Sequence, residues 1–303
     1  MTARRRPGLA VLVPVVVLGL LIWATDPRDL AARLGAADPG WLALGLGLLW
    51  GQTTLSALRW RVTARALGQD LPAGLAVREY LVAQLVNQVL PGGITGDALR
   101  AHRGREMAGG LWPALGAVAL ERTAGQVFML GALAIGLVLG SALDWPPGLR
   151  AVALAGVAIA ALVLSAALVA RRPHWLAAAG AGLRRGVLAP AVLPVQGILG
   201  VVIVTLNLAA FAAAARATGT ALSPVELLAL VPLILTAMLV PLGLAGWGWR
   251  EGAAAALFPL AGAAPAAGIA AAAAFGGLIL VSSLPGIIWL ARVPKPLPLL
   301  REH

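Results

Sequence analysis

Charged side chains interrupt the apolar sequence at three places, and each place includes an arginine. Ionisable groups inside an apolar span cost at least about 2.5 kcal/mol each near the membrane centre, so they usually face a cavity or one another. Arginine binds phosphate through two parallel N–H bonds, and a helix N-terminus adds further N–H donors. These residue types therefore predict a buried anion-binding site. The site is predicted to include Asn87, whose amide lies near the first of these places, and the charged residues Asp97, Arg100, Glu121, Arg122, Arg250 and Glu251.

Glycine and proline interrupt the helical pattern beside two of these places. One break separates Asn87 from Asp97, and the other lies just before Arg250. Irregular backbone at membrane depth is tolerated only where protein or a water-filled cavity covers it. We therefore expect the two breaks to form two halves of one polar site. The residues expected to shape them are Pro91, Gly92, Gly93, Gly96, Gly246, Gly248 and Gly252.

Each motif also has a simpler interpretation. The Arg122 side chain could extend to the membrane interface, although its acidic neighbour is too short to do so. The two tryptophans beside Arg250 could belong to an interfacial aromatic belt. Asn87 and Gln84, three residues apart on one helix face, could hold helices together by hydrogen bonds. The first Gly/Pro break could be an ordinary surface turn, but both of its flanks are apolar.

The composition identifies the environment of these motifs. The chain has 303 residues, of which 60% are hydrophobic and 12% are charged, whereas a soluble domain carries about 25% charge. This is the composition of an integral membrane protein. The net charge of +11 does not indicate nucleic acid, because the basic residues follow apolar runs, as in the positive-inside pattern. The chain contains no Cys, and its three His are scattered, so we expect no metal site and no cofactor.

Apolar helices must position the candidate residues, and the sequence predicts about six that span the membrane. The predicted fold is all-α and a single polytopic domain over residues 1–303. Two re-entrant broken-helix hairpins, at about residues 78–108 and 225–260, complete it. The arms of the first hairpin are predicted at 80–90 and 97–107, with Thr95 or Gly96 as the helix cap, and polar loops at 26–38 and 171–185. The six predicted spans are 9–23, 41–58, 112–139, 149–170, 195–215 and 268–290.

The distribution of Lys and Arg predicts the orientation. Basic clusters at both ends of the chain favour cytoplasmic termini and hairpins that enter from opposite faces. The basic group Arg59, Arg61 and Arg65, which follows the predicted span 41–58, is likewise assigned to the cytoplasm. Hairpins of opposite direction in the two halves fit an inverted repeat, which is a common plan for transporters. The basic residues predicted to lie outside the cytoplasm are Arg28, Arg33, Arg150 and Arg216 on the outer side and Arg122 and Arg250 within the membrane.

Three motifs in this order resemble those of the lysylphosphatidylglycerol synthase transmembrane-region family. They are Asn87 with the run Leu90-Pro91-Gly92-Gly93-Ile94-Thr95-Gly96-Asp97-Ala98-Leu99-Arg100, then Glu121-Arg122, then Gly246-Trp247-Gly248-Trp249-Arg250-Glu251-Gly252. The resemblance covers most of the chain and implies a polytopic inner-membrane protein of the lipid-flippase type. In longer relatives this region moves aminoacylated phosphatidylglycerol between leaflets, while a separate soluble domain synthesises that lipid. The resemblance therefore implies a stand-alone member without synthase activity.

We therefore expect a transporter of membrane phospholipid rather than an enzyme. In this hypothesis Arg122 and Arg250 bind the lipid phosphate, while Glu121, Glu251 and Asp97 balance them or contact a cationic headgroup. One alternative is a membrane-embedded enzyme for lipid-linked phosphate or sugar substrates, in which Glu121 and Asp97 act as a base or hold Mg²⁺. Another is a non-transporting partner of an envelope assembly. The sequence leaves the lipid, the direction of transport and the oligomeric state open.

Overall fold

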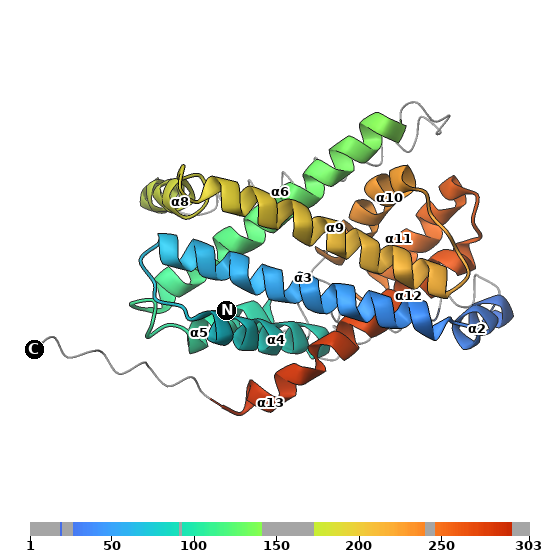
Figure 1. The fold of residues 1–303 in the computed structure, drawn as a ribbon, viewed down its shortest axis with the longest axis horizontal. Helices are drawn as coiled ribbons and strands as arrows, with labels where there is room; N and C mark the ends of the chain where they lie inside the picture. Colours follow the sequence, from blue (N-terminus) through green and yellow to red (C-terminus); the bar gives the residue numbers. More distant parts are fainter. Residues whose placement is uncertain (1–18, 20–26, 91–92, 141–172, 240–245, 293–303) are drawn as a thin grey trace, which may run out of the picture.

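The structure, a computed structural model, describes residues 19, 27–90, 93–140, 173–239 and 246–292 (Figure 1). Every regular element in these residues is a helix. The all-α prediction is therefore confirmed for those residues. In chain order the elements are α2 (Pro27–Gly35), α3 (Pro39–Ala66), α4 (Ala73–Val89), α5 (Thr95–Arg103), α6 (Leu111–Gly140), α8 (Pro173–Gly186), α9 (Leu193–Ala217), α10 (Pro224–Thr236), η1 (Ala237–Leu239), α11 (Trp249–Leu257), η2 (Phe258–Ala261), α12 (Pro265–Ser283), η3 (Leu284–Gly286) and α13 (Ile287–Leu290).

Side-chain caps fix the beginning of two of these helices. The Asp38 carboxylate accepts hydrogen bonds from the backbone N–H groups of Gly40 and Trp41 at 2.7 and 3.2 Å, and so begins α3. Ser223 and Glu226 form a reciprocal capping box at the start of α10. Proline follows both caps directly, where its fixed φ suits the first helical turn.

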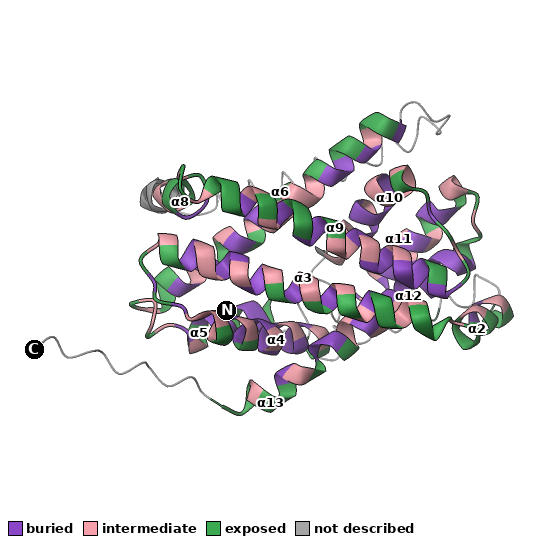
Figure 2. Cartoon of the chain, viewed as in Figure 1, coloured by how far each residue is buried: buried purple, intermediate pink, exposed green. Residues whose placement is uncertain are grey.

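Three helices have the length and hydropathy that a membrane span requires: α6, α9 and the continuous segment Pro265–Leu290. They coincide with three of the predicted spans. Figure 2 shows exposed residues along α6 and α9, among them Val138 at 71%, Ile198 at 66% and Val201 at 59% exposure. Apolar surface of this kind is expected where helices face lipid, and the protein is therefore a membrane protein. The predicted span 149–170, and the span 9–23 apart from residue 19, lie outside the described residues.

Several predicted boundaries were wrong. The predicted span 41–58 forms only part of the 28-residue α3. The arm predicted at 80–90 is the 17-residue α4, and the arm predicted at 97–107 is the nine-residue α5. Two predicted polar loops contain the helices α2 and α8. In α2 an Arg33–Asp29 ion pair of 2.9 Å joins residues four apart, a spacing that stabilises a helix but was overlooked in a charged segment.

The buried side chains form two main clusters at opposite ends of the bundle. In one, Phe211 of α9 packs against Phe258 and Phe275, with ring centroids 6.4 and 5.2 Å apart. In the other, Trp60 of α3 and Tyr80 of α4 pack with small residues of α5 and α6. Figure 1 accordingly shows α4 and α5 beside the C-terminal half of α3, and α10 and α11 near the other end. The two helix–break–helix pairs thus belong to different ends of the molecule.

Candidate functional site

The break between α4 and α5 is held by an amide side chain. The Asn87 Oδ1 accepts a hydrogen bond from the backbone N–H of Gly96 at 2.7 Å, and its Nδ2 donates to Asp97 Oδ2 at 3.3 Å. The prediction that Thr95 or Gly96 caps α5 was wrong, because the cap position is Ile94 and has no side-chain cap bond. Gly93 has a φ of +64°, which favours glycine. Pro91 and Gly92 lie outside the described residues.

Three arginines and two acids meet directly beside this break; we call them the first charge cluster. Glu121 accepts a hydrogen bond from Arg59 Nη2 at one oxygen and from Arg100 Nη2 at the other, both at 2.8 Å. Asp97 accepts from Arg100 Nε at 3.0 Å and is 2.8 Å from Arg122 Nη2. The acids thus bridge arginines from α3, α5 and α6. The predicted residues Asp97, Arg100, Glu121 and Arg122 do come together.

Most of the first charge cluster is buried, and the cluster has one more cation than anion. The side chains of Arg100 and Glu121 are 0% exposed, whereas that of Arg122 is 45% exposed. Arg100 lies between two rings, 4.7 Å from the centroid of Trp60 and 4.5 Å from that of Tyr80. Three buried guanidinium nitrogens of this cluster have no hydrogen-bond partner among the described residues: Arg59 Nε, Arg59 Nη1 and Arg100 Nη1. The cluster therefore has both the charge and the free donors to bind an anion.

The close packing of α5 on α4 depends on Gly96. A Cβ atom there would overlap the carbonyl oxygen of Ala83 and lie 2.7 Å from its carbonyl carbon. We expect Gly96→Ala to lower stability by about 1–3 kcal/mol, even though Gly→Ala inside a helix normally stabilises by about 1 kcal/mol. Thermal unfolding in detergent measures this. The matched control is Gly116→Ala on α6, where the added Cβ meets open space, and equal stability of the two variants would contradict the described packing.

A second buried pair begins α11; with Trp247 we call it the second charge cluster. Arg250 Nη2 and Nε donate to Glu251 Oε1 at 2.6 and 3.1 Å, and both side chains are 0% exposed. Glu251 Oε2 accepts from the backbone N–H of Gly248 at 2.6 Å. The Arg250 guanidinium lies 4.8 Å from the ring centroid of Trp247, and its Nη1 has no partner among the described residues. This pair is neutral overall but retains one free donor.

The glycines around α11 divide into two kinds. Gly246 and Gly248 have φ values of +76° and +85°, which glycine adopts without strain, and they form the turn before the helix. Gly252 lies inside α11, just as Gly96 lies inside α5, so these two do not belong to the irregular backbone predicted for them.

The two charge clusters do not meet in this structure. Among the described residues, no ion pair or hydrogen bond joins a charged group of the first cluster to one of the second. The prediction that both breaks face one shared site is therefore not seen in this conformation.

Sequence reasoning missed four members of the site: Arg59, Trp60, Tyr80 and Trp247. Arg59 was assigned to a cytoplasmic basic cluster, but it is only 4% exposed. The structure explains how Arg59 fits there: at Gly125, one helical turn after Glu121, a Cβ atom would lie only 2.7 Å from Arg59 Nη2. Tyr80 is the chain's single tyrosine, and it donates to Glu121 Oε1 at 3.4 Å.

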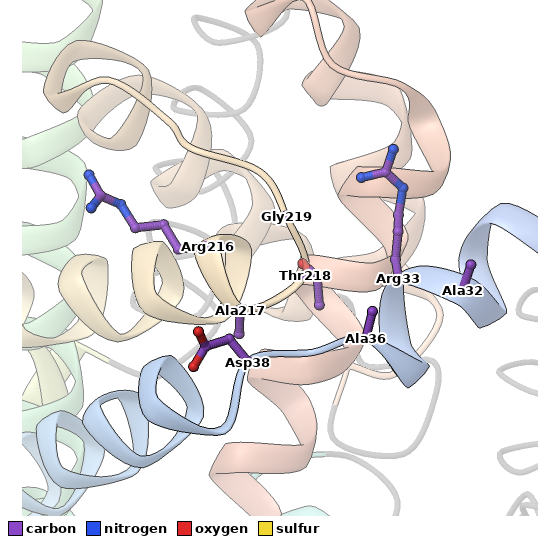
Figure 3. A pocket seen from close by; sticks show the side chains of 8 residues that line it. All are labelled: Ala32, Arg33, Ala36, Asp38, Arg216, Ala217, Thr218 and Gly219. Carbon is purple, nitrogen blue, oxygen red and sulfur yellow. The ribbon is translucent and has the colours of Figure 1, made fainter.

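A separate pocket of about 400 Å³ lies where α2, α3 and α9 meet (Figure 3). Its charged groups already have partners: Arg33 pairs with Asp29, Asp38 caps α3, and Arg216 lies 5.0 Å from the ring centroid of Trp41. Figure 3 shows the Arg33 and Arg216 side chains pointing apart. These groups do not converge on one point, so the pocket is a weaker candidate than either charge cluster.

A family model described as "Lysylphosphatidylglycerol synthase TM region" matches residues 8–286, which include every residue of both charge clusters. No curated protein sequence matches the chain.

Proposed function

Because the chain belongs to the lysylphosphatidylglycerol synthase TM region family, we propose that it moves anionic phospholipids between the two leaflets of the inner membrane. The observation that supports this proposal most strongly is the first charge cluster. A buried cluster with a surplus positive charge and free guanidinium donors, beside a broken helix, suits a lipid phosphate. The family match supports a lipid-related role in a membrane, and the transport activity is our proposal.

The arginines that we propose to hold the phosphate differ from the pair expected from the sequence. Arg122 forms an ion pair with Asp97, and its side chain is about half-exposed, so Arg122 would be the first arginine to meet the headgroup. Arg59 and Arg100 hold the free donors deeper in the protein. The phosphate would then replace part of the contact between Arg100 and Glu121. Movement of α5 away from α4 would open this route, because Arg100 and Asp97 both belong to α5.

The proposed topology follows from the same arrangement. The pairs α4–α5 and α10–α11 are re-entrant hairpins from opposite faces, with about six spanning helices around them and both termini in the cytoplasm. The position of the two pairs at opposite ends of the bundle supports this (Figure 1). A headgroup would pass from one charge cluster to the other while the acyl chains stay in lipid. The lipid gradient or an ion gradient would supply the driving force.

The acids of the first cluster favour transport over catalysis. Asp97 and Glu121 are each held by two arginines at 2.8–3.0 Å, so neither is placed as a free general base. In the described residues no group of three or more His, Cys, Asp or Glu could hold a metal ion. Metal-dependent turnover of a polyprenyl-phosphate substrate in detergent would nevertheless establish the enzyme alternative.

The test is lipid movement in reconstituted vesicles. Purified protein is placed in vesicles with fluorescent phosphatidylglycerol, and a membrane-impermeant quencher reports how fast the inner-leaflet label becomes accessible. We expect Arg59→Met to slow this movement by about ten-fold or more, because a hydrogen bond to a charged group contributes about 1.5–3 kcal/mol. Arg65→Met is the matched control on the same helix, since its side chain is 52% exposed.

Size-exclusion profiles must first show that both variants are folded. Arg65→Met should move lipid within about two-fold of the wild-type rate, as expected for a surface residue. Equal rates for Arg59→Met and the wild type would exclude Arg59 from the pathway, and a wild-type rate no faster than that of protein-free vesicles would exclude transport of this lipid.

A further inference from the structure

A polar stripe runs along α4 from the first charge cluster. Tyr80, Gln84 and Gln88 are spaced four residues apart, so they share one face of the helix. Tyr80 contacts the Arg100 guanidinium at one end of the stripe. At the other end the Gln88 Oε1 is buried and has no hydrogen-bond partner in the described structure. An unpaired buried acceptor is unusual in a native protein and calls for a partner that binds there.

The middle of the stripe is tied to two other helices by uncharged groups. Thr53 Oγ1 of α3 donates to Gln84 Oε1 at 2.9 Å, and Gln84 Nε2 donates to Ser282 Oγ of α12 at 3.2 Å. Thr53 is 1% exposed and Ser282 is 0% exposed, whereas Gln84 is half-buried. We call Thr53, Gln84 and Ser282 the neutral layer. It closes the space between α3, α4 and α12.

Along α3 and α12 the neutral layer lies about midway between Arg59 of the first charge cluster and Arg250 of the second. Thr53 precedes Arg59 by six residues in α3, which is about 9 Å along a helix. Ser282 follows Gly276 by six residues in α12, again about 9 Å, and Gly276 lies directly against the Arg250 guanidinium.

Arg59 and Gly276 lie on opposite sides of the neutral layer. Gly45 of α3 lies against Leu278 of α12, and Trp50 Nε1 donates to the Ser282 carbonyl oxygen at 3.1 Å. The two helices therefore run in the same direction where they touch. Arg59 lies beyond the layer toward the C-terminal end of α3, whereas Gly276 and Arg250 lie before it. A headgroup that moves from Arg59 to Arg250 along α3 and α12 would pass this layer.

From this placement we propose that Thr53, Gln84, Ser282 and Gln88 form an intermediate contact site for the phosphoester and hydroxyl oxygens of a lipid headgroup in transit. The inference rests on the proposed function. Amide and hydroxyl groups donate and accept hydrogen bonds, so they can replace water around such a headgroup. They carry no charge, so they bind a phosphate more weakly than the arginines do. A weak site between two strong ones lets the headgroup leave, as conduction through a multi-site pore requires.

The test separates the rate of movement from binding. The triple variant Thr53→Val, Gln84→Met and Ser282→Ala keeps the side-chain volumes nearly unchanged and removes the hydrogen bonds. We expect it to move fluorescent phosphatidylglycerol about ten-fold more slowly. The concentration of this lipid that gives half-maximal thermal stabilisation in detergent should stay within about two-fold of the wild-type value, because the arginines are intact. Thr205→Val is the matched control, because Thr205 is an exposed residue of α9 whose hydroxyl donates to the Val201 carbonyl oxygen of the same helix.

Two further outcomes decide the inference. The single variant Thr53→Ser retains the hydroxyl and loses only a methyl group, so it should move lipid at the wild-type rate. If the slower movement in the triple variant came from altered packing alone, Thr53→Ser would be slowed as well. If the wild type moves lipid and the triple variant moves it at the same rate, the contact site is overturned and the proposed function stands. A wild-type rate equal to that of protein-free vesicles would overturn both.

Discussion

Replacing Glu121 with Gln is expected to lower the stability of the protein by about 3–5 kcal/mol, because it removes one partner from a buried ion network. Glu121 is 0% exposed and accepts from Arg59 and Arg100 at 2.8 Å each. Gln has nearly the same shape, but it carries no charge and presents an NH₂ group to one of the two guanidinium groups. The first charge cluster would then hold three arginines against Asp97 alone. Closely packed cations without compensation cannot stay buried at low cost.

Chemical unfolding in detergent, followed by tryptophan fluorescence, measures this loss. Glu106→Gln is the control, because Glu106 is 58% exposed and 3.7 Å from Arg105, and such a surface pair contributes about 0–1 kcal/mol. Adding Arg59→Met to Glu121→Gln should recover part of the stability, since it removes one of the stranded cations. A Glu121→Gln protein as stable as Glu106→Gln would show that the described network is not formed.

The sequence was sufficient to identify most of the first charge cluster. Asp97, Arg100, Glu121 and Arg122 were found because a charge inside an apolar run must have a partner, and the structure joins them in one network. Arg59 was missed for the opposite reason. It belongs to a basic group that the positive-inside pattern explains well, but α3 continues to Ala66 and turns Arg59 inward. Charge distribution gives the side of the membrane and does not show which side chain points inward.

The helix contacts that separate the two charge clusters could not be predicted from the sequence, for a different physical reason. Helices α9 and α12 are apolar around their whole circumference, so no stripe of polar residues marks the face that each one buries. A small residue decides such a contact at Gly276 of α12 against Arg250, and the same holds where Gly96 of α5 lies against Ala83 of α4. Close approach of this kind depends on partners that are distant in the sequence. The separation of the two charge clusters is a consequence of that packing.

Adding one methyl group at Gly276 is expected to disrupt the second charge cluster, whereas the same change at the next residue should not. A Cβ atom at Gly276 would overlap Arg250 Nη2 and lie 2.7 Å from its Cζ, whereas a Cβ atom at Gly277 meets nothing within 4 Å. Both positions are inside α12, so helix propensity favours alanine equally, by about 1 kcal/mol. The difference between Gly276→Ala and Gly277→Ala therefore isolates the contact with Arg250.

Arg250 has little space to yield to that methyl group. Its guanidinium lies 4.8 Å from the Trp247 ring centroid and 6.0 Å from that of Phe275, and it is bonded to Glu251 at 2.6 Å. Overpacking costs about 1–3 kcal/mol, and the helix-propensity gain is the same for both variants, so Gly276→Ala should be about 1–3 kcal/mol less stable than Gly277→Ala. In vesicles we expect it to move phosphatidylglycerol at least about ten-fold more slowly, because the displaced guanidinium no longer receives the headgroup. If the two variants unfold at the same temperature and move lipid equally fast, Arg250 does not occupy the described position, and the second charge cluster has no part in transport.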